Sequence, residues 1–103
     1  MTRFDDVETE LRRIVDRLTS IPLSRAESVA APCRELGEFL VAQTRALTDD
    51  IPIDATVPAL GPQGLGAMIA VLGRDYLEAA KAADDPDIQP VLERLTAMRR
   101  SLP

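Results

Sequence analysis

The sequence lacks histidine and tryptophan altogether, and among its 103 residues it holds one cysteine, one tyrosine and two phenylalanines. Without histidine the chain has no imidazole base, no zinc site of the usual histidine type and no Glu-x-x-His pair for a di-iron bundle. With so few aromatic residues the core has to consist of aliphatic side chains, which favours packed helices over a β-sandwich. We therefore predict an all-α protein that is not an enzyme and that has no catalytic residues, metal or cofactor.

The scarcity of cysteine restricts the redox chemistry. Cys33 has no second cysteine with which to form an internal disulfide, so nothing in the sequence requires an oxidising compartment. Cys33 lies on the apolar stripe of a predicted helix, which favours a buried and inert thiol. One alternative stays open, because a helix that began at Pro32 would place Cys33 near its positive end and lower the pKa of the thiol.

Long hydrophobic runs and an excess of positive charge are also absent. The longest apolar run, residues 67–72, is far shorter than the roughly 20 residues that span a bilayer, and residues 1–10 do not resemble a signal peptide. The net charge is −5 and the arginines alternate with acids, so we expect neither nucleic-acid nor membrane binding. Arginine outnumbers lysine eleven to one. That bias is typical of a GC-rich bacterium, and we expect a bacterial cytoplasmic protein.

Apolar residues recur at steps of three and four in a first segment that ends before Pro22, which predicts an amphipathic helix. A second helix is expected from Ser24 to about Thr48, because Ser24 and Glu27 have the spacing of a capping box. Pro32 interrupts this segment, and a proline inside a helix removes one backbone hydrogen bond and clashes with the preceding turn. The second helix is therefore predicted to be kinked or broken at Pro32.

A third helix is predicted after Pro62, and a fourth is predicted to follow Asp87 as its N-cap residue. Each carries an apolar stripe, and the chain shows no internal repeat and no change of composition that would mark a second domain. We predict a small four-helix bundle that forms a single helical domain over residues 1–103.

The segment "DIPIDATVPALGPQGLG", residues 50–66, separates the second and third predicted helices. Its apolar residues alternate at Ile51, Ile53, Ala55 and Val57, whereas a flexible tether would be polar. We interpret it as an extended proline-rich strap across the bundle, long enough to let the second and third helices lie parallel. Pairing of this segment with a partner strand is the functional alternative. A phosphate-binding loop is disfavoured, because no lysine follows the glycines.

The third predicted helix carries a line of small residues that favours close approach of another helix. From this line and its neighbours we predict an interaction surface that comprises Gly66, Ile69, Ala70, Gly73 and Leu77. The predicted function is a protein–protein interaction or self-association module, with a homodimer or another protein as its partner. The alternative is a small-molecule-binding regulatory module with an apolar pocket between helices.

Two carboxylate pairs share helical faces, Glu35 with Glu38 and Asp75 with Glu78. Paired carboxylates perform acid–base catalysis when an apolar pocket separates their pKa values, but on exposed helices they are usually solvated charges. The acidic run at 84–87 lacks the ligand spacing of a calcium loop, and helix capping explains it better.

Overall fold

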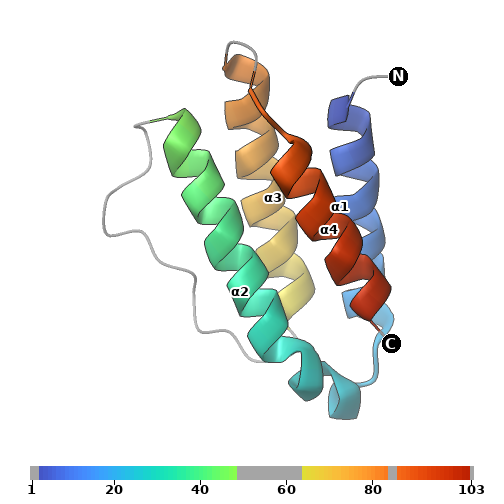
Figure 1. The fold of residues 1–103 in the computed structure, drawn as a ribbon. Helices are drawn as coiled ribbons and strands as arrows, with labels where there is room; N and C mark the ends of the chain where they lie inside the picture. The colour runs from blue at the N-terminus through green and yellow to red at the C-terminus, as the bar shows by residue number, and fades with distance from the viewer. Residues whose placement is uncertain (1–2, 49–63, 84–85, 103) are drawn as a thin grey trace.

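The computed structural model describes residues 3–48, 64–83 and 86–102, and within them it contains helices and no strands. The predicted all-α, four-helix architecture is confirmed (Figure 1). The predicted strap lies outside the described residues, apart from its last three positions, which begin the third helix. The four helices are α1 (Arg3–Ser20), α2 (Leu23–Leu47), α3 (Leu65–Ala82) and α4 (Gln89–Ser101).

The four helices pack as a ring in the order α2, α3, α1, α4. Helices α2 and α3 run in one direction, and α1 and α4 run in the other (Figure 1). The prediction that the second and third helices are parallel neighbours is therefore confirmed. Of the three pairs that are consecutive in the chain, α2 and α3 pack side by side, whereas α1 with α2 and α3 with α4 lie across the diagonals of the ring.

The core consists almost entirely of aliphatic side chains, as the scarcity of aromatic residues predicts. Each helix contributes one apolar face, and Tyr76 of α3 is the one aromatic side chain among the buried residues of the described chain. On the α2–α4 side, the Arg94 guanidinium covers the half-buried Phe39 ring at 4.9 Å from the ring centroid. The largest fully buried side chains are Ile14, Leu36, Leu40, Leu65, Ile69, Tyr76 and Leu95.

Helix α2 begins one residue earlier than predicted and is not capped by Ser24. Pro22 is the N-cap residue, and its carbonyl accepts hydrogen bonds from the backbone N–H groups of Arg25 at 2.9 Å and Ala26 at 3.0 Å. The carbonyl of Pro22, rather than the side chain of Ser24, thus accepts hydrogen bonds from the first turn of α2. Helix α2 continues through Pro32 without a break, while its N-terminal turns are inclined to the rest of the ribbon (Figure 1).

Helix α4 begins one residue later than predicted, with Ile88 rather than Asp87 as its N-cap residue. The Asp87 carboxylate nevertheless accepts a hydrogen bond from the backbone N–H of Gln89 at 3.2 Å. Asp87 therefore stabilises the start of α4, as expected, but it does so from the position before the N-cap residue. None of the four described helices is long and apolar enough to cross a membrane.

Candidate functional site

The line of small residues on α3 is where α1 packs. An ideal Cβ atom on Gly66 would lie 3.6 Å from Leu18 Cβ, and one on Gly73 would lie 2.6 Å from Leu11 Cδ2. The prediction that this line permits close helix approach is confirmed, and the approaching helix belongs to the same chain. Of the predicted interaction surface, Gly66, Ile69, Gly73 and Leu77 are buried and Ala70 is half-buried. A partner would reach Gly66 and Gly73 only after α1 had moved away.

Cys33 is fully buried in the core on α2. Desolvation by burial raises the pKa of the Cys33 thiol to about 11, against a smaller lowering effect of the neighbouring Arg34 charge. Because Pro32 lies inside α2, no helix begins at Cys33, and the alternative of a thiol activated by a helix N-terminus is wrong. The thiol is protonated at neutral pH and shielded from solvent, so it is a poor nucleophile.

The two carboxylate pairs differ in their surroundings. Glu35 and Glu38 are exposed on α2, whereas Asp75 and Glu78 border a surface hollow of about 470 Å³. This hollow lies between the C-terminal turns of α2 and α3, and the described residues contain no group of metal-ligating side chains there or elsewhere. Its lining consists of Thr44, Leu47, Thr48, Asp75, Glu78, Ala79, Ala82 and Ala83.

A second feature, which the sequence did not predict, is a cluster of four arginines at the opposite end of the bundle. Two neighbouring hollows of about 430 and 380 Å³ share Arg17 and Ser20. Arg13 and Arg99 line the first hollow and Arg25 lines the second. We call Arg13, Arg17, Arg25 and Arg99 the arginine surface. It is assembled from the second half of α1, the start of α2 and the end of α4.

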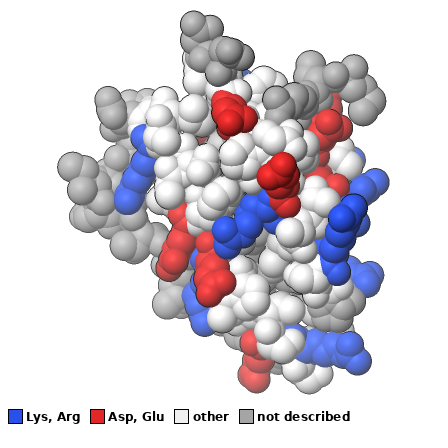
Figure 2. All heavy atoms as spheres, in the orientation of Figure 1, with Lys and Arg blue, Asp and Glu red and all other residues white. Residues whose placement is uncertain are grey.

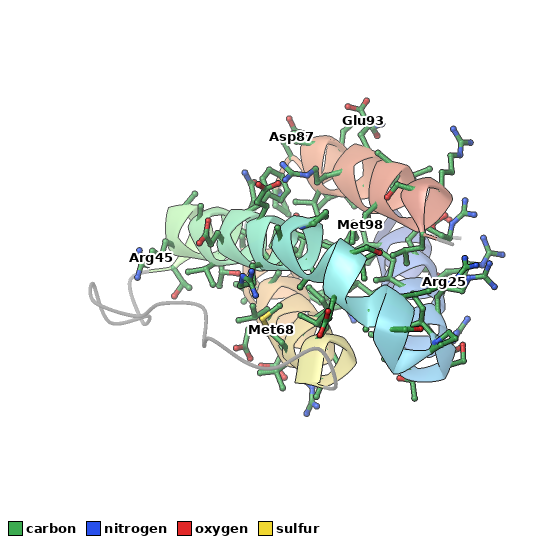
Figure 3. All side chains as sticks on the ribbon, turned by 90° about the horizontal axis from the view of Figure 1, so that it is seen from below. Arg25, Arg45, Met68, Asp87, Glu93 and Met98 are labelled. Atoms are coloured by element: carbon green, nitrogen blue, oxygen red, sulfur yellow. The ribbon has the colours of Figure 1, made fainter. Side chains whose placement is uncertain are left out.

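Part of the positive charge of the molecule lies beside α1 and α4. Positively charged side chains gather along the right-hand edge of the face in Figure 2, where α4 and α1 lie in the same orientation in Figure 1. Figure 3 places Arg25 at the α1 side of the bundle, away from Asp87 and Glu93 at the start of α4.

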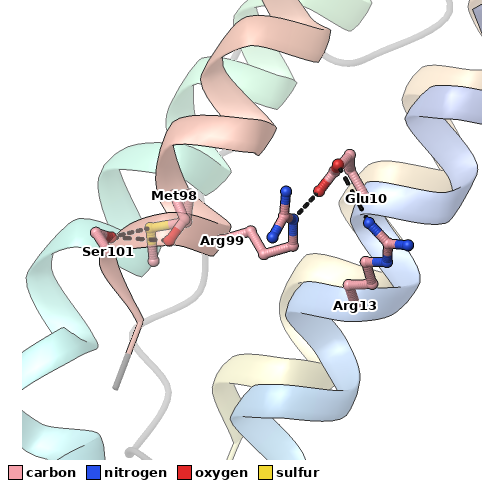
Figure 4. Close-up of polar contacts among 5 residues, drawn as sticks. All are labelled: Glu10, Arg13, Met98, Arg99 and Ser101. Carbon is pink, nitrogen blue, oxygen red and sulfur yellow. Dashed lines mark hydrogen bonds and ion pairs between the residues drawn. The ribbon is translucent and has the colours of Figure 1, made fainter.

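Glu10 holds two members of the arginine surface in place (Figure 4). Its carboxylate accepts a hydrogen bond from Arg99 Nε, and its other oxygen lies 3.8 Å from Arg13 Nη1. The side chain of Glu10 is 13% exposed and that of Arg99 is 31% exposed. The Glu10–Arg99 ion pair therefore joins α1 to α4 at a partly buried position. Within the described part of the chain, Arg17 and Arg25 make no ion pair.

The end of α1 also favours positive charge. The last carbonyl groups of a helix carry partial negative charge, and Arg17 lies in the last turn of α1. One of these carbonyls is satisfied locally, because Ser20 Oγ donates to Arg17 O at 3.2 Å. The Arg17 side chain itself lines both hollows.

Sequence reasoning could find only part of this surface. Arg13 and Arg17 are four residues apart, a spacing that places them on one helical face. Arg99 joins them because α4 packs beside α1, and Arg25 joins them through the turn that follows Ser20. No local sequence pattern predicts either arrangement. Arginines and acids alternate along the sequence of α1, which suggests a mixed surface. Adjacent residues on a helix point in different directions, however, so this alternation does not show which charges share a face.

Fold and surface together define a small all-α four-helix bundle with an inert buried thiol and an arginine-lined surface. Comparison with protein-family models, with curated proteins and with solved structures finds no match to this chain.

Proposed function

We propose that this chain is a non-enzymatic protein-interaction module of a bacterial cytoplasm. The observation that carries the proposal is the arginine surface: three helices bring four arginines together in a chain whose net charge is −5. Arginine is enriched at protein interfaces because its planar guanidinium makes several directed hydrogen bonds. The buried, protonated Cys33 and the absence of histidine leave few groups for catalysis and support the non-enzymatic part of the proposal.

The apolar surface favours a reversible contact over a permanent one. Among the large hydrophobic residues of the described chain, Val71 is the exposed one, with 52% of its surface accessible. Permanent interfaces resemble a divided core and expose a broad apolar face when they are separated. The described residues present no such face, so a partner is better accommodated at the charged hollows than at the line of small residues on α3.

A site-specific cross-linking experiment tests the proposal. A photoreactive residue at Ser20, where the two hollows meet, should give a discrete covalent product in the native cell. The same residue at Ala42, which is exposed on α2, is the control and should give none. A product of twice the chain mass of 11.2 kDa identifies a second copy, and any other mass identifies a different protein. No product at Ser20, or an identical pattern at Ala42, would refute the proposal.

The hollow at the C-terminal turns of α2 and α3 supports a second candidate function, a small-molecule-binding regulatory module. Its volume of about 470 Å³ is within the usual range for ligand sites. Apolar alanine and leucine side chains form part of its lining, and Asp75 and Glu78 would favour a ligand with a positive charge. A rise in melting temperature with aliphatic amines, lost on Glu78→Gln, would favour this function over the first.

The finer part of the predicted fold also stays a proposal. We propose that α2 is kinked at Pro32 and that an extended strap joins α2 to α3. The parallel direction of α2 and α3 supports the strap, because the joining segment has to return along a helix of 18 residues, about 27 Å long. A segment of the length available spans that distance easily when it is extended.

A further inference from the structure

The two hollows of the arginine surface adjoin each other, and we treat them together as one depression. They meet at Arg17 and Ser20, and between them they extend along the end of α1 from Arg13 to Pro22. The eight helical residues from Arg13 to Ser20 rise about 11 Å, which is the length of about three residues of extended peptide. The depression is therefore long enough to hold a short peptide segment.

Positive charge in this depression exceeds the negative charge available to neutralise it. Asp16 is the carboxylate in the described lining, and Glu10 lies just outside it in contact with Arg13 and Arg99. Four arginines against two carboxylates leave a surplus of two positive charges. At physiological ionic strength charges act over about 8 Å, so this local surplus determines what binds there despite the negative charge of the whole chain.

The remaining lining distinguishes between possible anions. Ile21 and Pro22 give the second hollow an apolar edge, and the described lining of both hollows contains no aromatic ring on which a base could stack. A nucleic acid longer than the depression would extend over the surrounding surface of a chain with net charge −5, where phosphates are repelled. Carboxylates, by contrast, match the paired N–H groups of arginine one residue at a time.

We infer that the arginine surface binds a short carboxylate-rich segment of a partner protein, with an apolar side chain of that segment placed on Ile21 and Pro22. This inference rests on the interaction function proposed above and names the chemistry of the partner. Arg17 and Arg25, which make no ion pair within the described residues, make the principal contacts. Arg13 and Arg99 are already oriented by Glu10 and complete the surface.

Fluorescence anisotropy with a labelled peptide, Asp-Glu-Glu-Leu-Glu-Asp flanked by glycines, tests the inference on the full chain. The peptide should bind, and a peptide with lysine in place of each acid should not. Binding should weaken severalfold between low and physiological salt, because the contacts are charge-assisted and partly exposed. The paired variant Arg17→Glu/Arg25→Glu should weaken binding at least about tenfold, equivalent to about 1.4 kcal/mol.

A control of equal charge separates the site from the overall field. Arg34→Glu/Arg74→Glu changes the net charge by the same amount at exposed positions on α2 and α3, and it should alter binding less than about twofold. Thermal unfolding of both variants establishes that each remains folded. If Arg17→Glu/Arg25→Glu loses the fold, the milder Arg17→Gln/Arg25→Gln replaces it.

Three outcomes would overturn the inference: no binding at about 1 mM peptide, an equal loss in the control variant, or displacement of the peptide by lower concentrations of duplex DNA. The cross-linking experiment keeps this failure distinct from failure of the proposed function. A product at Ser20 with no peptide binding would refute the acidic partner and leave the interaction module in place. No product at Ser20 would refute the module itself.

Discussion

Gly73 offers the sharpest test of how α3 packs on α1. We predict that Gly73→Ala destabilises the protein although alanine is the better helix former. The added Cβ would lie 2.6 Å from Leu11 Cδ2 and 2.8 Å from Leu11 Cδ1. Carbon atoms in contact are normally about 3.5–4.0 Å apart, so the end of the Leu11 side chain has to move by about 1 Å. Leu11 is 7% exposed and belongs to the core cluster, so it moves only at the expense of its neighbours.

Two opposing effects determine the size of the change. Replacing glycine by alanine inside a helix stabilises it by up to about 1 kcal/mol. Inserting a methyl group into a packed core costs about 1–3 kcal/mol. The difference is a net loss of about 1 kcal/mol, which corresponds to a fall of about 4–8 °C in melting temperature for a domain of this size.

Gly66→Ala is a matched control, because it makes the same substitution on the same face of the same helix. A Cβ atom there would lie 3.3 Å from Thr19 Oγ1 and no closer than 3.6 Å to other atoms of α1. Thr19 is exposed, and its hydroxyl has to shift by only a few tenths of an ångström while it stays bonded to Val15 O. Gly66 is the second residue of α3, where the gain in helix propensity is only partial. We expect its free energy of unfolding to stay within about 0.5 kcal/mol of the wild type.

Urea denaturation followed by circular dichroism measures both variants, and a double-mutant cycle isolates the contact. Leu11→Ala alone should cost about 2–5 kcal/mol, because it leaves a cavity. In that background Gly73→Ala should be neutral or stabilising, since its methyl group enters the vacated space, and the coupling should be about 1–2 kcal/mol. Two results would refute the packing of α3 on α1: a Gly73→Ala variant as stable as the wild type, or a double variant whose loss of stability equals the sum of the two single losses.

Three further perturbations test other parts of the structure. Burial raises the pKa of the Cys33 thiol from its ordinary value of 9.0 to about 11, so the contribution of the protonated thiol to the free energy of unfolding is fully present below pH 9. This free energy should fall by about 2–3 kcal/mol as the pH rises from 9 to 11. Urea titrations should show no such fall in Cys33→Ala. Glu10→Gln removes the charge that joins α1 to α4 and should cost about 1 kcal/mol, less at high salt; an unchanged urea midpoint would contradict the role given to this contact. Pro32→Ala restores a backbone donor within the continuous helix α2 and should raise the melting temperature, with a stabilisation of up to about 3 kcal/mol; a lower melting temperature would mean that the bend of α2 is needed by the core.

Much of the fold follows from local patterns in the sequence. The apolar stripes predicted four helices, and Pro22 predicted the end of the first. The length of the segment after Thr48 predicted that α2 and α3 can be parallel. These features depend on side chains within a few residues of one another, or on chain length alone. Local residue patterns and the distance that an extended segment can span determine these features, so the sequence is sufficient to predict them.

The helix starts show where local rules compete. Ser24 and Glu27 have the capping-box spacing, yet Pro22 occupies the N-cap position and its carbonyl receives the first hydrogen bonds. Asp87 likewise supports α4 from one residue outside the predicted position. In both cases two nearby residues could have begun the helix, and the difference in free energy between them is smaller than sequence rules resolve.

The arginine surface could not be predicted, because it depends on which helices pack against which. Arg25 follows Arg17 by only eight residues, but Arg99 comes from the other end of the chain. They meet because α4 lies beside α1 and because the turn after Ser20 brings the start of α2 to the same end of the bundle. Because the first and last helices, α1 and α4, are neighbours in the ring, it joins residues that no sequence window contains.

The line of small residues on α3 illustrates the same limit and links packing to the proposed site. A sequence stripe shows that a helical face can be approached closely, but it does not identify the helix that approaches. Here α1 does so, with Leu11 and Leu18 turned toward α3 and Arg13 and Arg17 turned outward. The arginine surface therefore exists only while α1 is packed on Gly66 and Gly73. A substitution that weakens this packing should lower peptide binding in proportion to the folded fraction, whereas Arg17→Glu/Arg25→Glu should lower binding in a chain that remains folded.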